Sequence, residues 1–227
     1  MGRFRDALAG PGLAAIAEVK RRSPSAGELR PDADPARLAA EFERAGAAAV
    51  SILVDERFAG SPADLTAARS ASRLPLLAKG FFATTEELTE LRQAGADAVL
   101  LLLRDLDDGQ AQALLEHAEE LGLDALVEAH DAEELERAVR LDAAIVGVNA
   151  RDLGTFGEDL GLSERLADRI PDEVTAVAES AIRAPADAER MAEAGYDAVL
   201  VGEALVRSDD PTQLVDAMSR HSVRTRR

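Results

Sequence analysis

The sequence predicts a single-domain α/β protein built as a closed (β/α)8 barrel. Three observations favour this fold: an internal repeat of about 50 residues, short apolar runs that alternate with helical patterns, and polar residues at the ends of those runs. The length of 227 residues fits, since such barrels typically take about 250 residues. We expect residues 14–219 to form the barrel, after a short N-terminal segment (residues 1–13) and before a basic, disordered tail (residues 220–227).

The repeat appears in three similar segments and one weaker copy. They read RAGAAAVSIL, QAGADAVLLL, EAGYDAVLVG and LDAAIVGVN, and they start at residues 44, 93, 193 and 141. In the three similar segments an amphipathic helix ends at a glycine, and a short β-rich run follows. Glycine tolerates the left-handed conformation that commonly ends a helix, so Gly46, Gly95 and Gly195 are predicted to terminate helices.

Each repeat holds about two strand–helix units, which makes eight strands. The apolar runs of the repeat supply four, and the others are expected at residues 14–20, 74–79, 124–129 and 173–180. The helical patterns between them include residues 35–45, 85–94, 110–121, 131–140 and 185–194. Continuous apolar runs are typical of parallel strands buried on both faces. An open doubly wound sheet is the alternative, but its Gly-rich turn after the first strand has no match in KRRSPSAGEL.

Composition and charge narrow the classes of function. The chain has no cysteine, which excludes disulfides, thiolate metal sites and cysteine nucleophiles and fits a reducing cytoplasm. The net charge of −17 opposes binding to nucleic acid and to anionic membranes. An anionic small substrate would therefore need a local site of a few cations and backbone N–H groups. We find no targeting signal and no apolar run long enough for a membrane span, and we expect a cytoplasmic protein.

Chemistry in this fold takes place at the carboxyl ends of the strands. The residues expected there are Glu18, Lys20, Ser51, Lys79, Glu128, Asn149, Arg151, Glu179, Ser180, Gly202 and Glu203. The loops after the last two strands commonly hold a phosphate in barrel enzymes. Ser180 offers a hydroxyl there, and Gly202 lets the backbone approach an oxyanion. The segment after Gly202 can start a short helix whose N-terminus faces the anion.

Two lysines are unusual in this chain. Of its 26 basic residues only Lys20 and Lys79 are lysines, and both fall at predicted strand ends. An ammonium can change its protonation state in a protein, whereas a guanidinium in effect cannot. Proton transfer, a Schiff base or a titratable point charge is therefore the expected use of these positions. Chance placement, or structural pairing with Glu18, is the alternative.

Three carboxylates end apolar strands, where charged groups are rarely buried unless they are paired. For Glu18, Glu128 and Glu179 we expect acid and base roles, with pKa values set by the lysines. Structural ion pairs are the alternative. The three histidines show no metal-ligand spacing, so no metal site is expected, and no other role is assigned to them: His117, His130 and His221.

The ordered motifs resemble those of the indole-3-glycerol-phosphate synthase family, which closes the indole ring in tryptophan biosynthesis. The resemblance runs through IAEVKRRSPSAGEL, SILVDERFAGSPADL, LGLDALVEAHDAEEL, VGVNARDL, AESAI and DAVLVGEAL. It implies a carboxy-lyase that acts on the phosphorylated 1-(2-carboxyphenylamino)-1-deoxyribulose 5-phosphate, with loss of carbon dioxide and water and without a cofactor or metal. We expect a monomer, with other tryptophan-pathway enzymes as candidate partners.

The resemblance also implies roles for the strand-end residues. Lys79 matches the general acid of ring closure, Glu128 an acid/base residue that acts with it, and Lys20 the lysine that contacts the substrate carboxylate. Glu18 and Asn149 match residues that hold substrate hydroxyls and orient the lysines. The other matches are active-site positions (Arg151, Glu179), phosphate-site positions (Ser23, Ser180, Ala181, Gly202, Glu203) and apolar walls for the anthranilate ring (Phe58, Phe81). We expect Ser51 to contact the substrate as well.

Four features depart from the family pattern. The segment before the first strand is short and lacks the usual helix over the barrel mouth, and the loop after the second strand is about one residue shorter. Gly80 stands where the family has Asp, and Ala181 replaces a Gly. These departures fit a working enzyme with a trimmed lid. They also fit a paralogue that acts on a related substrate, or a non-catalytic barrel that binds a phosphorylated ligand.

Overall fold

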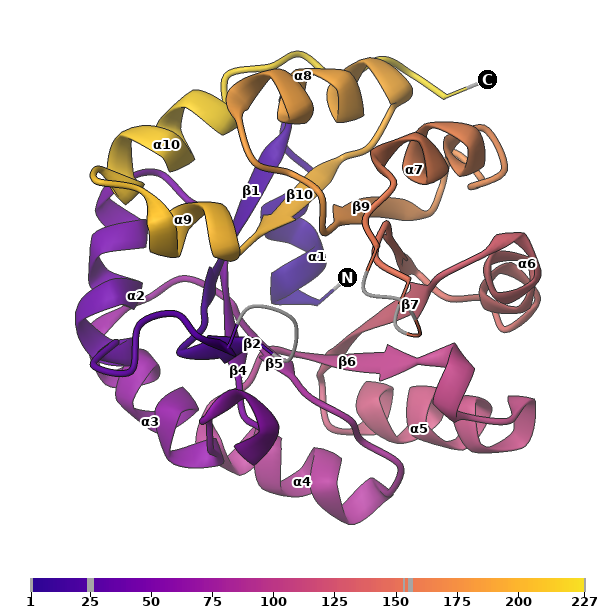
Figure 1. Ribbon diagram of the computed structural model, residues 1–227. Coiled ribbons are helices and arrows are strands. Elements are labelled where there is room, and N and C mark those ends of the chain that lie inside the picture. Colours follow the sequence, from indigo (N-terminus) through magenta and orange to yellow (C-terminus); the bar gives the residue numbers. More distant parts are fainter. Residues whose placement is uncertain (1, 24–26, 153, 155–156, 227) are drawn as a thin grey trace.

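Eight parallel strands close into a barrel with helices around it, as predicted (Figure 1). The computed structural model describes residues 2–23, 27–152, 154 and 157–226. The barrel strands are β1 (Ala14–Val19), β4 (Ala49–Leu53), β5 (Leu76–Lys79), β6 (Ala98–Leu102), β7 (Asp124–Ala129), β8 (Ile145–Asn149), β9 (Thr175–Glu179) and β10 (Ala198–Val201). Pairing of Ile16 in β1 with Leu200 in β10 closes the ring, so the open-sheet alternative is excluded.

Helices alternate with these strands and form the outer layer. They are α2 (Pro35–Arg44), α3 (Pro62–Ala71), α4 (Thr85–Ala94), α5 (Asp108–Glu120), α6 (Ala132–Arg140), α7 (Leu160–Ala167), α8 (Pro185–Ala194), α9 (Glu203–Arg207) and α10 (Pro211–Met218). The predicted helix ends are confirmed, because Gly46, Gly95 and Gly195 have φ of 84°, 108° and 100°. None of the described helices has the length and apolar character needed to cross a membrane.

The sequence repeat is also visible in the hydrogen bonds. Asp97 accepts the backbone N–H of Leu76 at 2.9 Å, and Asp197 accepts that of Ala176 at 2.7 Å. Each aspartate lies just before its own strand and binds the neighbouring strand near its start. Both also pair with arginine, for example Asp97 with Arg69 at 2.9 Å. Equivalent positions of the repeat therefore make equivalent contacts at the amino ends of the strands.

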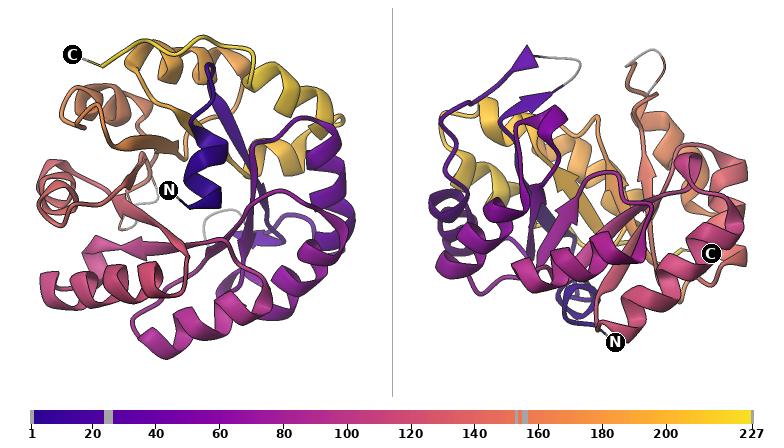
Figure 2. Two further views of the ribbon diagram at one scale, coloured as in Figure 1. Left: turned by 180° about the vertical axis from the view of Figure 1, so that it is seen from behind. Right: turned by 90° about the horizontal axis from the view of Figure 1, so that it is seen from below.

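The barrel interior is apolar toward these amino ends. Side chains from all eight barrel strands pack there, among them Ile16, Leu77, Leu126, Ile145 and Val177. The short helix α1 (Arg3–Leu8) covers this end of the barrel (Figure 2). Its Phe4 and Leu8 are fully buried in the same cluster, and Asp124 accepts the N–H groups of Phe4 and Arg5. The N-terminal segment thus lies opposite the carboxyl ends of the strands.

The C-terminal residues differ from the expected disordered tail. Ser222 forms a backbone bridge with Gly12, and Arg226 is only 6% exposed. Its guanidinium donates to the carbonyl oxygens of Gly195 and Val174 and pairs with Asp197 at 3.0 Å. Composition alone suggested a solvated segment, but these acceptors at the amino end of the barrel hold the arginine in place.

We expect Leu8→Ala to lower the free energy of unfolding by about 2–5 kcal/mol, because it leaves a cavity in a fully packed apolar cluster. Chemical denaturation measures the change. Asp6→Ala, an exposed position on the same helix, is the matched control and should change stability far less. An unchanged unfolding midpoint for Leu8→Ala would show that α1 does not seal the barrel.

Candidate active site

Charged side chains replace the apolar interior at the carboxyl ends of the strands. Glu18, Lys79, Glu128, Asn149 and Glu179 come from β1, β5, β7, β8 and β9. The three glutamates are at most 2% exposed. Successive residues of a strand point to opposite faces, so each of these side chains continues the inward-facing row of its own strand. The barrel therefore brings together residues that are up to 161 positions apart, from Glu18 to Glu179.

Lys79 is at the centre of this cluster. Its Nζ lies 2.5 Å from Oε2 of Glu179, 3.7 Å from Oε2 of Glu18 and 3.8 Å from Oε2 of Glu128. The first contact is a short charge-assisted hydrogen bond, and the other two are longer ion pairs. Three carboxylates from three different strands thus surround one ammonium.

A second set of contacts orients the carboxylates. Lys20 Nζ lies 2.9 Å from Oε1 of Glu18, and Asn149 Nδ2 donates to Oε1 of Glu128 at 2.9 Å. Two glycines leave space for the acids. A Cβ at Gly147 would lie 2.2 Å from Oε1 of Glu179, and a Cβ at Gly202 would lie 2.4 Å from Oε1 of Glu18. Because Gly202 has no side chain, it leaves room for the buried carboxylate of Glu18. The sequence predicted a phosphate contact for Gly202 and did not predict this role.

The electrostatics of the cluster follow from burial opposed by charge. Burial alone would lower the pKa of Lys79, but the three carboxylates outweigh it and raise that pKa above its ordinary value. Burial opposes the ionised forms of Glu18 and Glu128 as well, yet the pKa of each is lowered by its cationic neighbours. Glu179 differs, because burial and the nearby Glu128 carboxylate outweigh Lys79 and raise the pKa of Glu179 to about 8.

These shifts balance the charge of the site. Three carboxyl groups face two ammonium groups, and the His130 ring beside Glu128 is itself paired with a fourth carboxylate, Glu134. Full ionisation would therefore leave one net negative charge in a buried place. A proton retained on Glu179 at neutral pH removes that charge. Lys79 remains an ammonium, which is the form that a proton donor requires.

Two cavities meet at the lysines. One, of about 580 Å³, is polar and extends over the loops after β9 and β10, where Ser180, Ala181 and Gly202 line it. The other, of about 390 Å³, is bounded by Phe58 and Phe81. Both cavities are lined by the same central residues: Glu18, Lys20, Lys79, Arg151 and Ser180. The site therefore has a polar end, a charged centre and an aromatic end.

The aromatic end is a stacked wall. The rings of Phe58 and Phe81 are 6.2 Å apart between centroids and inclined by 11°. The guanidinium of Arg57 lies over the Phe81 ring, with Cζ 3.6 Å from its centroid. Gly80 beside Phe81 is also explained, because a Cβ there would lie 2.8 Å from Cζ of Phe82. The glycine that departs from the family pattern thus makes room for a neighbouring aromatic ring.

The polar end is made by strained backbone and arginine pairs. Ser180 and Ala181 have φ of 64° and 59°, a left-handed conformation that favours glycine. Nearby, Glu158 pairs with Arg151 and, at 2.6 Å, with Arg183. Glu203 begins the predicted short helix, α9, and pairs with Arg207 at 2.9 Å.

Of the expected residues, Ser51 lies away from the two cavities, and the side chain of Ser23 is not described. Ser51 is fully buried in β4, where it pairs in register with Glu18, and neither cavity is lined by it. Ser23 belongs to β2 (Arg22–Ser23), which pairs with β3 (Gly27–Glu28) in a hairpin above the mouth (Figure 2). The position of the Ser23 side chain lies outside the described part of the chain.

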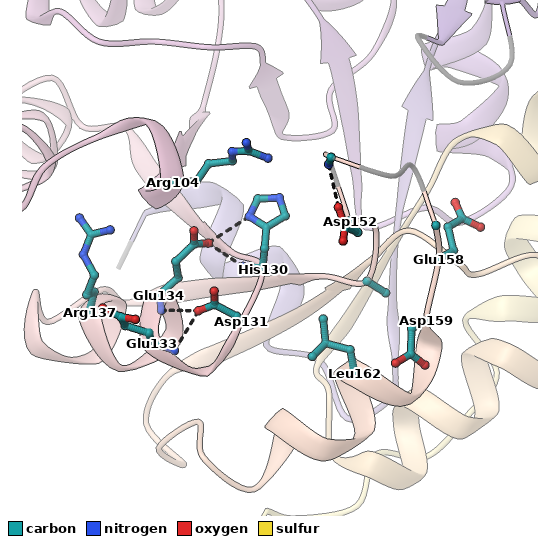
Figure 3. Close-up of a pocket in the computed structure, with 13 residues that line it drawn as sticks. Arg104, His130, Asp131, Glu133, Glu134, Arg137, Asp152, Glu158, Asp159 and Leu162 are labelled. Carbon is teal, nitrogen blue, oxygen red and sulfur yellow. Dashed lines mark hydrogen bonds and ion pairs between the residues drawn. The ribbon is translucent and has the colours of Figure 1, made fainter.

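One residue of the site was missed in the sequence. His130, just after β7, lies with Nε2 3.1 Å from Oε1 of Glu128 and Nδ1 3.1 Å from Oε2 of Glu134. Figure 3 shows the imidazole beside Glu134 at the edge of a further cavity. The available signal was the spacing in VEAHDAEE, which places a glutamate two residues before and another four residues after the histidine.

Known proteins are similar to this chain over most of its length. The family model described as indole-3-glycerol phosphate synthase matches residues 2–218. A protein of that name from Streptomyces griseus is 50% identical over 210 residues, which cover 92% of this chain and 78% of the relative. Another from Parafrankia sp. is 51% identical over 215 residues, which cover 93% of this chain and 80% of the relative.

A solved structure, tryptophan synthase subunit alpha from Legionella pneumophila, is similar in fold. Its TM-score is 0.70 at 18% identity, with 96% of this chain and 97% of that chain covered.

We expect Gly147→Ala to fold but to displace the Glu179 carboxylate from Lys79, because the new Cβ overlaps Oε1. The variant should lose stability. The loss should be smaller when Glu179 is also replaced by alanine, because the overlapping carboxylate is then absent. The coupling energy between the two substitutions should be about 0.5–3 kcal/mol. Thermal unfolding of the four proteins measures it. Gly10→Ala, with nothing within 4 Å of its Cβ, is the control. Additive effects at Gly147 and Glu179 would contradict the steric argument.

Proposed function

The chain belongs to the indole-3-glycerol phosphate synthase family, and we propose that it closes the indole ring of 1-(2-carboxyphenylamino)-1-deoxyribulose 5-phosphate. The products are indole-3-glycerol phosphate, carbon dioxide and water. The monomeric state and the cytoplasmic location stay predictions of the sequence.

The observation that carries this proposal is the order of the three parts of the site. The substrate has a carboxylated aromatic ring at one end, a phosphate at the other and a ketone-bearing chain between them. An aromatic cavity, two lysines and a polar cavity follow one another in the same order. The ring would lie against Phe58 and Phe81, and the phosphate near Ser180 and Ala181. The ketone would then lie beside Lys79.

The first step needs a proton donor at the ketone. As the ring carbon that carries the carboxylate attacks the carbonyl carbon, a C–C bond forms and the carbonyl oxygen takes a proton. We assign this proton to Lys79, which its carboxylates hold as an ammonium. Loss of carbon dioxide then restores the aromatic ring. In the dehydration the new hydroxyl takes a proton and leaves as water, and the methylene carbon beside the nitrogen loses a proton, which forms the second double bond of the five-membered ring.

The neighbouring residues supply the remaining roles. Glu128, 3.8 Å from Lys79, is placed to exchange protons in the dehydration step. Lys20 contributes the second positive charge of the central region and would bind the substrate carboxylate before it leaves as carbon dioxide. Glu18 and Asn149 orient Lys20 and Glu128 through the contacts described above.

Turnover by the purified protein tests the proposal. The indole product fluoresces, and the chain has no Trp, so background emission is low. We expect fluorescence to rise on addition of the anilino-deoxyribulose phosphate. Binding of this substrate without product would instead favour a paralogue with a changed reaction or a non-catalytic barrel.

We expect Lys79→Arg to be nearly as inactive as Lys79→Ala, with turnover reduced by about 10²–10⁴-fold, because a guanidinium does not serve as the acid. Stability should separate the two variants. Arg keeps a positive charge among the three carboxylates, whereas Ala leaves them uncompensated, which costs about 3–5 kcal/mol. Steady-state kinetics and thermal unfolding measure both effects. If Lys79→Arg were active, Lys79 would act only as a positive charge and not as the proton donor.

We expect Ala181→Gly to tighten inorganic phosphate binding by about tenfold, since φ of 59° strains an alanine by roughly 1–2 kcal/mol and a glycine would let the backbone approach the anion. Calorimetric titration with phosphate measures the affinity. Ala59→Gly is the matched control: φ of 58° strains Ala59 equally, but it lies after η1 (Glu56–Phe58) and outside the polar cavity. Equal phosphate affinities in wild type and Ala181→Gly would mean that the loop already accommodates alanine.

A further inference from the structure

We propose that His130 is a positioning residue that keeps the Glu128 carboxylate ionised and directed at Lys79. This inference rests on the proposed function and adds to it a group that does not touch the substrate. His130 follows β7 immediately, only two residues after Glu128, and its side chain is 12% exposed.

The imidazole lies between two carboxylates. Nε2 is 3.1 Å from Oε1 of Glu128, in an ion-pair contact that is not an aligned hydrogen bond. On the other side, Nδ1 is 3.1 Å from Oε2 of Glu134, and the backbone N–H of His130 donates to the same oxygen at 2.8 Å (Figure 3). Glu134 therefore holds both the ring and the backbone of His130.

A carboxylate oxygen 3.1 Å from each ring nitrogen favours a protonated ring. A neutral imidazole carries one N–H, so its other nitrogen would present a lone pair to a carboxylate. The imidazolium presents an N–H to each side. The electrostatics agree: burial would lower the pKa of His130, but Glu128 and Glu134 outweigh it and raise that pKa to about 9.

Other charged groups surround the cavity of about 880 Å³ beside the ring. They are Arg104 from η2 (Leu103–Asp105), Asp131, Glu133 and Arg137 at or in α6, and Asp152, Glu158 and Asp159 after β8, with Lys79 of β5 beyond Glu128. Arg137 is engaged by Asp108 at 2.8 Å and by two carbonyl oxygens. Among the described residues, the carboxylates within 4 Å of the His130 ring nitrogens are those of Glu128 and Glu134.

The two oxygens of Glu128 thus contact different groups. Oε1 is held by Asn149 Nδ2 at 2.9 Å and by the His130 ring. Oε2 faces Lys79 at 3.8 Å and has no hydrogen-bond partner among the described residues. Removing the imidazolium would leave Asn149 as the anchor of Oε1 and would remove one of two cations that oppose protonation of this buried acid.

The pH profile of kcat tests the role. In His130→Gln we expect the acid limb of kcat to move up by about one to three pH units, because the nearby positive charge that lowers the Glu128 pKa is lost. KM should change little, since His130 does not contact the substrate. An acid limb that stays in place in a folded His130→Gln protein would overturn the proposal.

Glu134→Gln gives an independent test farther from the reacting atoms. Without Glu134 the pKa of His130 falls, so the ring should be charged at low pH and neutral at high pH. We expect kcat near that of the wild type at low pH. It should fall as pH rises through the lowered His130 pKa, because a neutral ring can turn a lone pair toward Glu128 and then no longer directs this carboxylate at Lys79. Glu133→Gln removes the same charge from the same helical turn, where the side chain is exposed, and should leave the profile unchanged. Identical profiles for the two variants would contradict the role of His130.

An NMR titration of the free protein separates this inference from the proposed function. The chain has 3 histidines, and the signal absent from His130→Gln identifies His130. We expect it to titrate near pH 9, and lower in Glu134→Gln. A His130 that titrates at or below about 6.5, the ordinary value, would refute the charged ring. If His130 titrates near pH 9 but the protein makes no product, the proposed function is refuted and the charge of His130 is not.

Discussion

The ammonium of Lys79, surrounded by three buried carboxylates, is the interaction on which the rest of the site depends. Unpaired, any one of these charges would be costly in the barrel interior. Glu18, Glu128 and Glu179 come from separate strands, so the ion pairs form only when the barrel is closed. Gly147 and Gly202 have no Cβ where one would collide with the acids. Charge and sterics therefore constrain the same layer of the barrel.

The groups that stabilise the fold and the groups of the candidate active site lie at opposite ends of the barrel. At the amino ends of the strands, apolar side chains, α1 and the buried Arg226 close the structure. At the carboxyl ends, the charged cluster separates an aromatic cavity from a polar one. A substrate with an aromatic ring and a phosphate can span both cavities while its reacting carbon lies at Lys79. In this proposed arrangement a strongly negative chain would bind the phosphate through a few local groups and not through its overall charge.

Much of this could be predicted from the sequence, and what could not has physical reasons. The repeat and the continuous apolar runs predicted the barrel, and barrel topology brings strand ends such as Lys79 and Glu179 together whatever their separation in the chain. His130 was missed because its role depends on two distances that no motif states. The packed tail depends on carbonyl acceptors for Arg226, and the left-handed φ of Ala181 is a backbone property that composition does not encode.

The central claim is that Glu179 keeps a proton at neutral pH, because burial and the Glu128 carboxylate raise its pKa, while Glu18 and Glu128 are ionised and hold Lys79 as an ammonium. Infrared spectroscopy of the free protein tests it most directly, because a protonated carboxyl group has a C=O stretch distinct from that of a carboxylate. We expect an acid band at neutral pH that disappears as pH rises through about 8 and is absent from Glu179→Gln. A wild-type spectrum at neutral pH without that band would mean that all three acids are ionised, and would contradict the charge balance described here.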